Sequence, residues 1–312
     1  MAPPSEFTQP LSKPFNIAVV GGGISGLTLT LALLKQRIPV TLYEAAPRFG
    51  EIGAGIAFGP NAQRAMSLIS PYVYAGFERV ATRNQWPSKK EVWFDFRYGE
   101  SCGDRRKVGE KIYTLECEGG STSVHRAHFL DEMVKLLPDG IANFNKRLVD
   151  FAQDDNGVVL KFQDGMETRH DALIGTDGIR SRVRMVMLGE NDPAAKAVFS
   201  GKIAYRGLIP MDKAVELLGE EYAKNSQMYF GLHGHVLTFC IEKGKTMNGM
   251  QCFLLSVILM HPADCSKSGR VPQPRKLGFA AVGRSCANGE DVQGLRRLGR
   301  LGQEHPQPDG ND

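Results

Sequence analysis

The sequence FNIAVVGGGISG at residues 15–26 decides the fold, because a short apolar run ends abruptly in three glycines. Such a run, stopped by a turn, is typical of a buried parallel strand. Residues 27–36 are rich in Leu, Ala and Thr and predict a buried helix, and PVTLY at 39–43 predicts a second strand. Strand, turn, helix and strand in about 30 residues predict the βαβ unit of a doubly wound sheet.

Three glycines in this stretch, Gly21, Gly23 and Gly26, match the spacing G-x-G-x-x-G at the start of the expected helix. The first permits a tight turn, the second lets backbone N–H groups approach a pyrophosphate, and the third lets helix and strand pack closely. The helix N-terminus adds N–H donors and a partial positive charge. Glu44 follows Gly26 by 18 residues, where an acidic side chain binds ribose hydroxyls. The pattern predicts a dinucleotide site but does not separate FAD from NAD.

The remaining chain predicts more strands and further helices, one of them after the glycine-dense loop at 50–59 and Pro60. Residues 126–137 have apolar residues at helical spacing, and residues 158–162 and 172–174 read as strands. Residues 92–96, 202–209 and 227–241 read as strands of a second sheet, with a bend at 231–234. The sequence therefore predicts an α/β protein with a Rossmann-type domain and a smaller antiparallel β-sheet domain.

Composition narrows the class of protein. Of 312 residues, 42% are hydrophobic and 23% charged, which indicates a soluble globular chain. A net charge of +4 with scattered Lys and Arg gives no case for nucleic acid. The longest apolar run, 253–260, is far shorter than the roughly 20 residues of a membrane span, and residues 1–14 lack the apolar core of a secretory signal. We therefore expect a cytoplasmic protein without a transmembrane segment.

Cysteine and histidine patterns predict no metal site. The six cysteines have no Cys-x-x-Cys spacing, so we expect reduced thiols. His233 and His235 would share one face of a strand, but two histidines without further ligands do not make a metal site. We interpret them as residues of a loop or a strand end.

Several motifs, in order, resemble those of class A flavoprotein monooxygenases. They are the glycine turn at 21–26, Glu44, the run GAGIA at 53–57, HR at 125–126 and GTDGIRS at 175–181. The resemblance covers about residues 15–247 and is strongest to the salicylate hydroxylase-like branch, which includes fungal polyketide hydroxylases. It implies FAD as cofactor, NAD(P)H and O2 as co-substrates, and a small aromatic substrate that is hydroxylated.

The resemblance also implies roles for single residues of the cofactor site. Glu44 would bind the adenosine ribose, and Ala57 would lie along the flavin chain through its backbone. Arg126 would bind phosphate or ribitol oxygens through its fork of donors. Asp177 would belong to a motif that contacts the FAD ribose and serves NAD(P)H use. From the residues alone, Arg126 is a solvated helix-start residue, and the Asp177 region is a strand-to-helix turn with Ser181 as N-cap.

Arg206 is the expected catalytic residue. The run AYRG at 204–207 resembles a substrate-domain strand of the polyketide hydroxylases, in which the arginine binds the phenolate of the substrate. A guanidinium there favours the ionised phenol, whose ring is electron-rich, by roughly 1.5–3 kcal/mol. The alternative is a surface arginine on a half-buried strand. Phe239 stands where that group often has a tyrosine, which puts dearomatising chemistry in doubt but leaves ring hydroxylation open.

Composition and the resemblance together predict four segments. We expect a disordered N-terminus at 1–14, an FAD-binding domain at 15–190 with strands near 92–96 in the substrate sheet, and a substrate domain at 191–247. Residues 248–312 are Gly-, Arg- and Pro-rich, predict a disordered tail and contain no second flavin motif of the form Gly-Asp-Ala-Ala-His-x-x-x-Pro. We therefore expect a truncated or mis-predicted gene product. Two alternatives stay open: a catalytically impaired remnant, and an NAD-dependent dehydrogenase.

Overall fold

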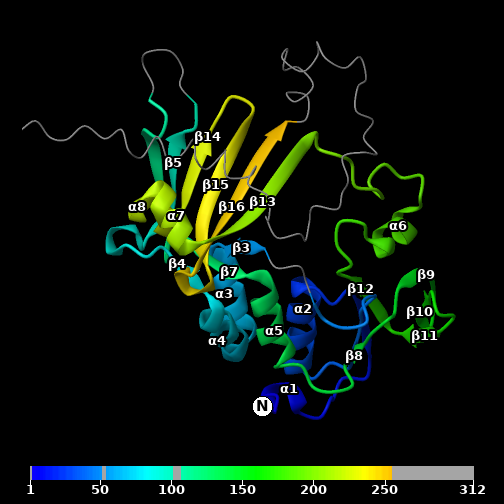
Figure 1. Cartoon of the computed structure of the whole chain (residues 1–312). Coiled ribbons are helices and arrows are strands. Elements are labelled where there is room, and N and C mark those ends of the chain that lie inside the picture. The colour runs from blue at the N-terminus through cyan, green and yellow to red at the C-terminus, as the bar shows by residue number, and fades with distance from the viewer. Residues whose placement is uncertain (1, 51–53, 101–106, 255–312) are drawn as a thin grey trace, which may run out of the picture. The chain divides into compact units, whose positions relative to one another are not determined.

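A computed structural model of the chain describes residues 2–50, 54–100 and 107–254. It divides into two compact units, each made of segments that are far apart in the sequence (Figure 1). Unit 1 is built from Met1–Glu51, Asn61–Val80 and Arg126–Phe199. Unit 2 is built from Ile52–Pro60, Ala81–His125 and, among the described residues, 200–254.

Unit 1 contains the expected βαβ unit, so the predicted fold class is confirmed. Its parallel sheet has the order β12 (Ala172–Gly175), β1 (Ile17–Val20), β2 (Val40–Tyr43), β8 (Ala142–Asn143). All four residues of β1 are buried, as the apolar run predicted. Helix α2 (Ile24–Lys35) connects β1 to β2 and buries Leu27, Leu31 and Leu34.

A three-stranded antiparallel sheet and several helices complete unit 1. The sheet consists of β9 (Leu148–Asp154), β10 (Gly157–Phe162) and β11 (Glu167–His170). Its apolar side chains share one core with Val20 and Tyr43 of the parallel sheet. The helices are α1 (Ser5–Thr8), α3 (Pro60–Ile69, which begins at the last residue of a unit 2 segment), α4 (Pro71–Val80), α5 (Arg126–Val134) and α6 (Arg182–Leu188).

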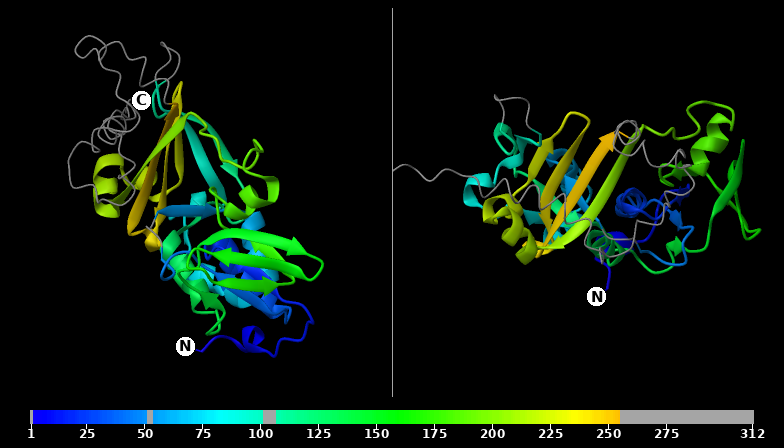
Figure 2. Two further views of the ribbon diagram at one scale, coloured as in Figure 1. Left: turned by 90° about the vertical axis from the view of Figure 1, so that its right-hand side faces the viewer. Right: turned by 45° about the horizontal axis from the view of Figure 1, so that its top comes forward.

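Unit 2 is a six-stranded sheet with helices on one face (Figure 2). Its order is β13 (Lys202–Pro210), β16 (Thr246–Leu254), β15 (Gly234–Ile241), β14 (Gln227–Phe230), β5 (Val92–Tyr98), β6 (Lys111–Glu116). Every neighbouring pair is antiparallel except β14 with β5, which is parallel. Helices α7 (Met211–Leu218) and α8 (Glu220–Lys224) pack on Cys240 and Met247 of this sheet.

Smaller elements also belong to unit 2. A second sheet has the order β3 (Gly55–Phe58), β7 (Thr122–His125), β4 (Thr82–Arg83), and the 3₁₀ turns η1 (Pro87–Lys89) and η3 (Glu242–Gly244) precede β5 and β16. In the part of the chain that the structure describes, no helix is long and apolar enough to span a membrane.

The observed units differ from the expected boundaries in three places. The segment expected to be a disordered N-terminus contains α1, because the side chain of Phe7 is only 2% exposed and anchors it. The segment 15–190 is interrupted by 52–60 and 81–125, which pair with strands of unit 2. Strand β16 continues past 247 to Leu254, with each residue opposite one of β13. The expected tail beyond 254 lies outside the described residues.

Candidate functional site

The glycine turn between β1 and α2 is packed tightly on one side and open on the other. Gly21 has a φ of +108°, and a Cβ there would lie 2.5 Å from the Thr176 carbonyl oxygen. A Cβ on Gly26 would lie 1.8 Å from the Gly21 oxygen. A Cβ on Gly23 would meet nothing within 4 Å. The turn therefore needs glycine at 21 and 26 to pack, and its open side at Gly23 fits the approach of a phosphate.

The Glu44 carboxylate holds this turn against the end of β2. The N–H of Gly22 donates to Oε2 at 2.6 Å, and the N–H of Ala46 donates to Oε1 at 2.7 Å. An ionised carboxylate has about four lone-pair sites, so both oxygens retain acceptor capacity after these bonds. The side chain is only partly buried. Glu44 can thus accept hydroxyl donors of a ribose while it fixes the turn.

Asp177 lies in the turn after β12, directly beside Gly21, where a Gly21 Cβ would come within 2.9 Å of its Cα. Its Oδ2 accepts the N–H groups of Arg182 at 2.6 Å and Val183 at 3.1 Å. Ser181 is the N-cap of α6 and accepts the N–H of Arg184, so the predicted capping turn is confirmed. Oδ1 of Asp177 is buried and accepts no hydrogen bond from the described residues. That oxygen fits a hydroxyl donor from a bound ligand.

Two other expected cofactor residues, Arg126 and Ala57, are not among the contacts described for the glycine turn. Arg126 is the first residue of α5, is exposed, and belongs to unit 1 with the glycine turn. Ala57 lies in β3 of unit 2, opposite Ser123 of β7. Within unit 1, Glu44 and Asp177 each lie against the glycine turn; the contacts above do not include Arg126 or Ala57. Their expected roles remain predictions.

Arg206 is exposed on β13, on the sheet face opposite α7 and α8. Its cross-strand neighbour is Met250, whose side chain must point away from the face of Met247, because side chains alternate along a strand. The same row continues through Leu237 and Met228 to Phe96. One guanidinium thus stands at the edge of a row of apolar side chains.

Phe239 is packed rather than available to a ligand. Its side chain is 5% exposed and lies in a core cluster with Phe94 and Ile241. A Cβ on Gly55 would lie 2.8 Å from its ring, so the glycine of β3 makes room for it.

Comparisons with known proteins agree with this arrangement. Residues 19–61 match the family described as NAD(P)-binding Rossmann-like domain. The chain is 48% identical over 242 residues to the 6-methylsalicylate 1-monooxygenase of Aspergillus terreus, covering 76% of this chain and 53% of that protein. It is 43% identical over 244 residues to a salicylate hydroxylase of Pseudomonas putida, covering 76% and 54%. Along these residues the chain is similar to FAD-dependent monooxygenases and salicylate hydroxylases.

A solved structure supports the same relationship, and the expected resemblance is confirmed. The structure described as a salicylate hydroxylase substrate complex aligns with a TM-score of 0.66 and 30% identity, covering 84% of this chain and 59% of that one. The chain spans about half the length of the curated monooxygenases it matches.

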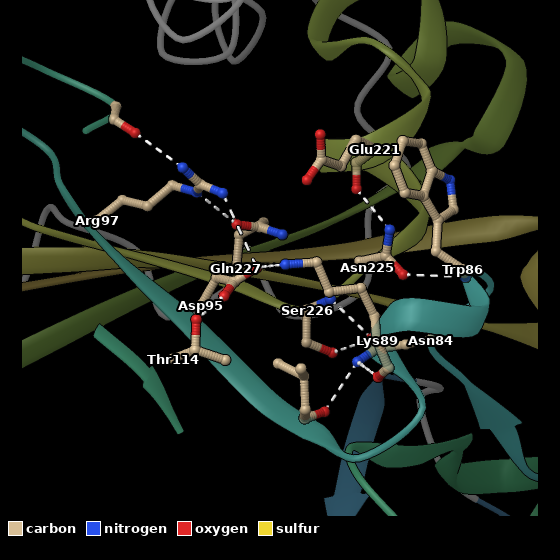
Figure 3. Close-up of polar contacts among 12 residues, drawn as sticks. Asn84, Trp86, Lys89, Asp95, Arg97, Thr114, Glu221, Asn225, Ser226 and Gln227 are labelled. Atoms are coloured by element: carbon tan, nitrogen blue, oxygen red, sulfur yellow. Dashed lines mark hydrogen bonds and ion pairs between the residues drawn. The ribbon is translucent and has the colours of Figure 1, made fainter. Parts of the chain in front are cut away.

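The sequence does not predict a buried ion cluster on the face of the six-stranded unit 2 sheet that α7 and α8 cover (Figure 3). Asp95 is fully buried; Lys89 donates to it at 2.5 Å and Thr114 at 2.6 Å. Arg97 donates to Gln227 at 2.7 Å and lies 4.7 Å from the centre of the Tyr222 ring on α8. These contacts join β5, β6, β14 and α8. The bond between Arg97 and Gln227 joins residues 130 positions apart, so no periodicity in the sequence indicates it.

The charges in this cluster keep Asp95 ionised. Burial alone would raise the pKa of the Asp95 carboxyl, but the hydrogen bonds from Lys89 and Thr114 and the charges of Lys89 and Arg97 outweigh it and lower the pKa. The cluster is therefore a structural support of the sheet that carries Arg206. Removing one partner of such a buried ion pair strongly destabilises the fold, because the other charge is left buried and unpaired.

The described residues contain no group of three His, Cys, Asp or Glu side chains able to hold a metal ion. His235 lies in β15, and His233 lies in the bend that precedes it. Both line a hollow of about 230 Å³ together with Lys202 and Cys252.

Proposed function

We propose that the chain binds the adenosine-diphosphate half of FAD at the glycine turn of unit 1. The observation that carries this proposal is the hydrogen bond from Gly22 to Glu44, after which both carboxylate oxygens keep acceptor capacity. The neighbouring Gly23 faces open space. The backbone N–H groups at the start of α2 would bind the pyrophosphate, because the first turn of a helix has unsatisfied donors. Glu44 would accept from the adenosine ribose and would repel a 2′-phosphate.

The remaining residues would hold the rest of the cofactor. Asp177 would accept a hydroxyl through its buried Oδ1, which has no other partner among the described residues. Arg126 would donate to phosphate or ribitol oxygens from the start of α5. Ala57 would contact the flavin chain through its backbone. The bound cofactor would supply the oxygen-activating chemistry, with NAD(P)H as reductant and O2 as oxidant.

The proposed reaction is hydroxylation of a small phenolic substrate, supported by the relatives whose names include salicylate and 6-methylsalicylate. Arg206 would bind the phenolate oxygen and keep the substrate ionised, because a guanidinium next to a phenol favours its charged form. The apolar row beside Arg206 would pack against the aromatic ring and exclude water. Phe239 offers no hydroxyl to this substrate.

FAD titration of the purified chain tests the cofactor proposal. We expect a yellow protein, and we expect Glu44→Ala to weaken FAD binding by about tenfold or more, since a charge-assisted hydrogen bond is lost. Glu167→Gln is the control, because Glu167 is an exposed acid of unit 1 on β11. A folded wild-type protein that binds no FAD rejects the proposal. A colourless protein that binds NAD supports a dehydrogenase instead.

A second experiment tests catalysis separately from binding. Because the chain spans only about half of its relatives' length, a chain that binds FAD without turnover is a distinct candidate function. Measuring NADH and NADPH oxidation with and without phenolic substrates separates the two. We expect Arg206→Ala to slow hydroxylation while FAD stays bound; unchanged turnover in this variant removes Arg206 from the site, and no turnover in wild type supports the non-catalytic candidate.

A further inference from the structure

A hollow of about 230 Å³ lies where β13, β16 and β15 approach the bend at 231–234. Each of the three strands contributes one polar side chain to it. These are Lys202 from β13, Cys252 from β16 and His235 from β15. The remaining lining residues are Leu232, His233, Gly234 and Phe253.

The lining of this hollow favours an anion. Lys202 is exposed and positively charged, and none of the lining residues is acidic. Burial, and secondly the charge of Lys202, lower the pKa of His235, so its imidazole is neutral near pH 7 and can take up a proton when an anion binds. The nearest acid of the bend, Glu100, accepts the backbone N–H of Leu232 at 3.2 Å. It does not line the hollow.

The hollow lies on the same face of the sheet as Arg206. Residues 202, 204 and 206 alternate onto one face of β13, and Ala204 is opposite Cys252, which is opposite His235. Lys202 and Arg206 are four residues apart, so their Cα atoms are separated by about 13 Å along the strand. On β13 the side chain between them on this face is that of Ala204, with Cys252 and His235 beside it; the apolar row of Met250 and Leu237 lies beside Arg206.

We propose that this hollow binds a carboxylate carried by the phenolic substrate at the end remote from the hydroxyl that Arg206 binds. This inference rests on the proposed function, which assigns the phenolate to Arg206. Two cationic anchors so far apart, with the small side chain of Ala204 between them on β13 and the apolar row beside Arg206, fit a phenol extended beyond one ring. A salicylate-sized molecule has its two oxygen groups on adjacent carbons, so it spans much less than the about 13 Å between the two Cα atoms.

Calorimetric titration of the full chain, with and without added FAD, tests this inference. The probes are 6-hydroxy-2-naphthoate, 2-naphthol and salicylate, and the variants are Lys202→Met and Lys213→Met. Lys213 is the matched control, because it is an exposed lysine of α7, on the other face of the sheet. We expect the naphthoate to bind about tenfold more tightly than naphthol to wild type and to Lys213→Met. Lys202→Met should bind the two equally, and salicylate should show little dependence on Lys202.

Proton NMR of the His235 ring, assigned with His235→Gln, locates the binding. Saturating naphthoate should raise the pKa of His235, and naphthol should leave it unchanged. Equal binding of naphthoate and naphthol to wild type, absence of naphthoate binding, or a preference retained in Lys202→Met overturns the inference. If the chain binds naphthoate more tightly than naphthol but binds no FAD, the proposed function is wrong and the carboxylate site stands. If the chain binds FAD but binds naphthoate and naphthol equally, the carboxylate site is wrong and the proposed function stands.

Discussion

Gly22 and Gly23 are neighbours in the turn, and the structure gives them opposite surroundings. A Cβ on Gly22 would lie 2.8 Å from the Phe49 ring and 2.9 Å from Oε2 of Glu44. A Cβ on Gly23 would meet nothing within 4 Å. The G-x-G-x-x-G pattern assigns no role to its second position, so the need for glycine at 22 is visible only in three dimensions.

These surroundings predict different effects for two similar substitutions. Gly22→Ala must displace the Glu44 carboxylate, so both the free energy of unfolding and FAD affinity should fall. Gly23→Ala should leave the unfolding free energy nearly unchanged, but its methyl group would occupy the approach to the pyrophosphate, and FAD affinity should fall at least tenfold. Urea unfolding without ligand and FAD titration measure the two effects. Normal FAD affinity in Gly23→Ala would show that the cofactor does not approach this side of the turn.

A buried histidine makes the stability of unit 1 depend on pH. The ring of His170 donates from Nδ1 to Asn16 Oδ1 at 2.6 Å, since that oxygen can only accept, and Nε2 then accepts from the Tyr43 hydroxyl at 2.9 Å. Burial lowers the pKa of His170 below its ordinary value of 6.5, and the charge of Asp171 only partly opposes this. Tyr43 immediately precedes Glu44, so the same network supports the candidate ribose acid.

The sign of this dependence follows from proton binding. Below about pH 6.5 the unfolded chain binds a proton at His170 that the folded chain resists, so stability is full above that pH and falls on acidification. We expect the urea midpoint of wild type to drop between pH 7.5 and 5.5, and His170→Gln to show a smaller drop. Comparison of the two proteins isolates this residue from His235. Identical slopes would mean that His170 does not titrate differently in the two states.

At the scale of elements, helix α6 couples the Asp177 turn to the fold. Ser181 caps its N-terminus with a 3.0 Å bond to Arg184, and Asp177 accepts two further N–H groups of the first turn. Ser181→Ala should lower the unfolding free energy by about 1 kcal/mol, the usual effect of losing an N-cap. It should leave FAD affinity unchanged, whereas Asp177→Ala should reduce both quantities. Denaturant unfolding and FAD titration of the two variants check this; unaltered FAD affinity in Asp177→Ala leaves Asp177 with a capping role alone.

The elements also show what sequence could and could not predict. Strands β1 and β2 and helix α2 follow from local periodicity, because each buries side chains at the spacing of its own geometry. The glycine turn and Glu44 follow from the spacing of the G-x-G-x-x-G motif and of the acidic residue after it. The sequence does not predict strand β16, since NGMQCFL at 248–254 alternates weakly. It forms because β13 and β15 pair with it on both sides.

Long-range pairing escapes sequence reasoning altogether. The parallel pairing of β5 with β14 joins residues about 130 positions apart and places Asp95 opposite Gln227. The full burial of Asp95 depends on this pairing, although Lys89 and Arg97, which stabilise its charge, lie within six residues of it. Alternation along the strand predicts that Arg206 and Lys202 share one face of β13. The hollow between β13 and the bend at 231–234 cannot be predicted in this way, because it depends on the register of three strands.

At the scale of the whole molecule, the two units are interleaved along the chain, and this has a consequence for fragments. Residues 1–199 contain all of unit 1, including Glu44, Arg126 and Asp177, yet they also carry β5 and β6 of unit 2. In the intact chain β5 pairs with β14, and Phe94 is buried against Phe239 and Ile241. All of these partners lie after residue 199.

The fragment 1–199 should therefore aggregate when it is expressed alone. It would expose one edge of β5 and the apolar face of Phe94, and an unpaired apolar strand edge is a template for association with other chains. Co-expression of residues 200–312 should restore a soluble complex, because β14 can then pair with β5. Size-exclusion chromatography of the fragment, with and without its complement, measures this. A soluble, monomeric fragment 1–199 would show instead that unit 1 tolerates the inserted strands of unit 2 without their partners, and such a fragment should then bind FAD through the glycine turn alone.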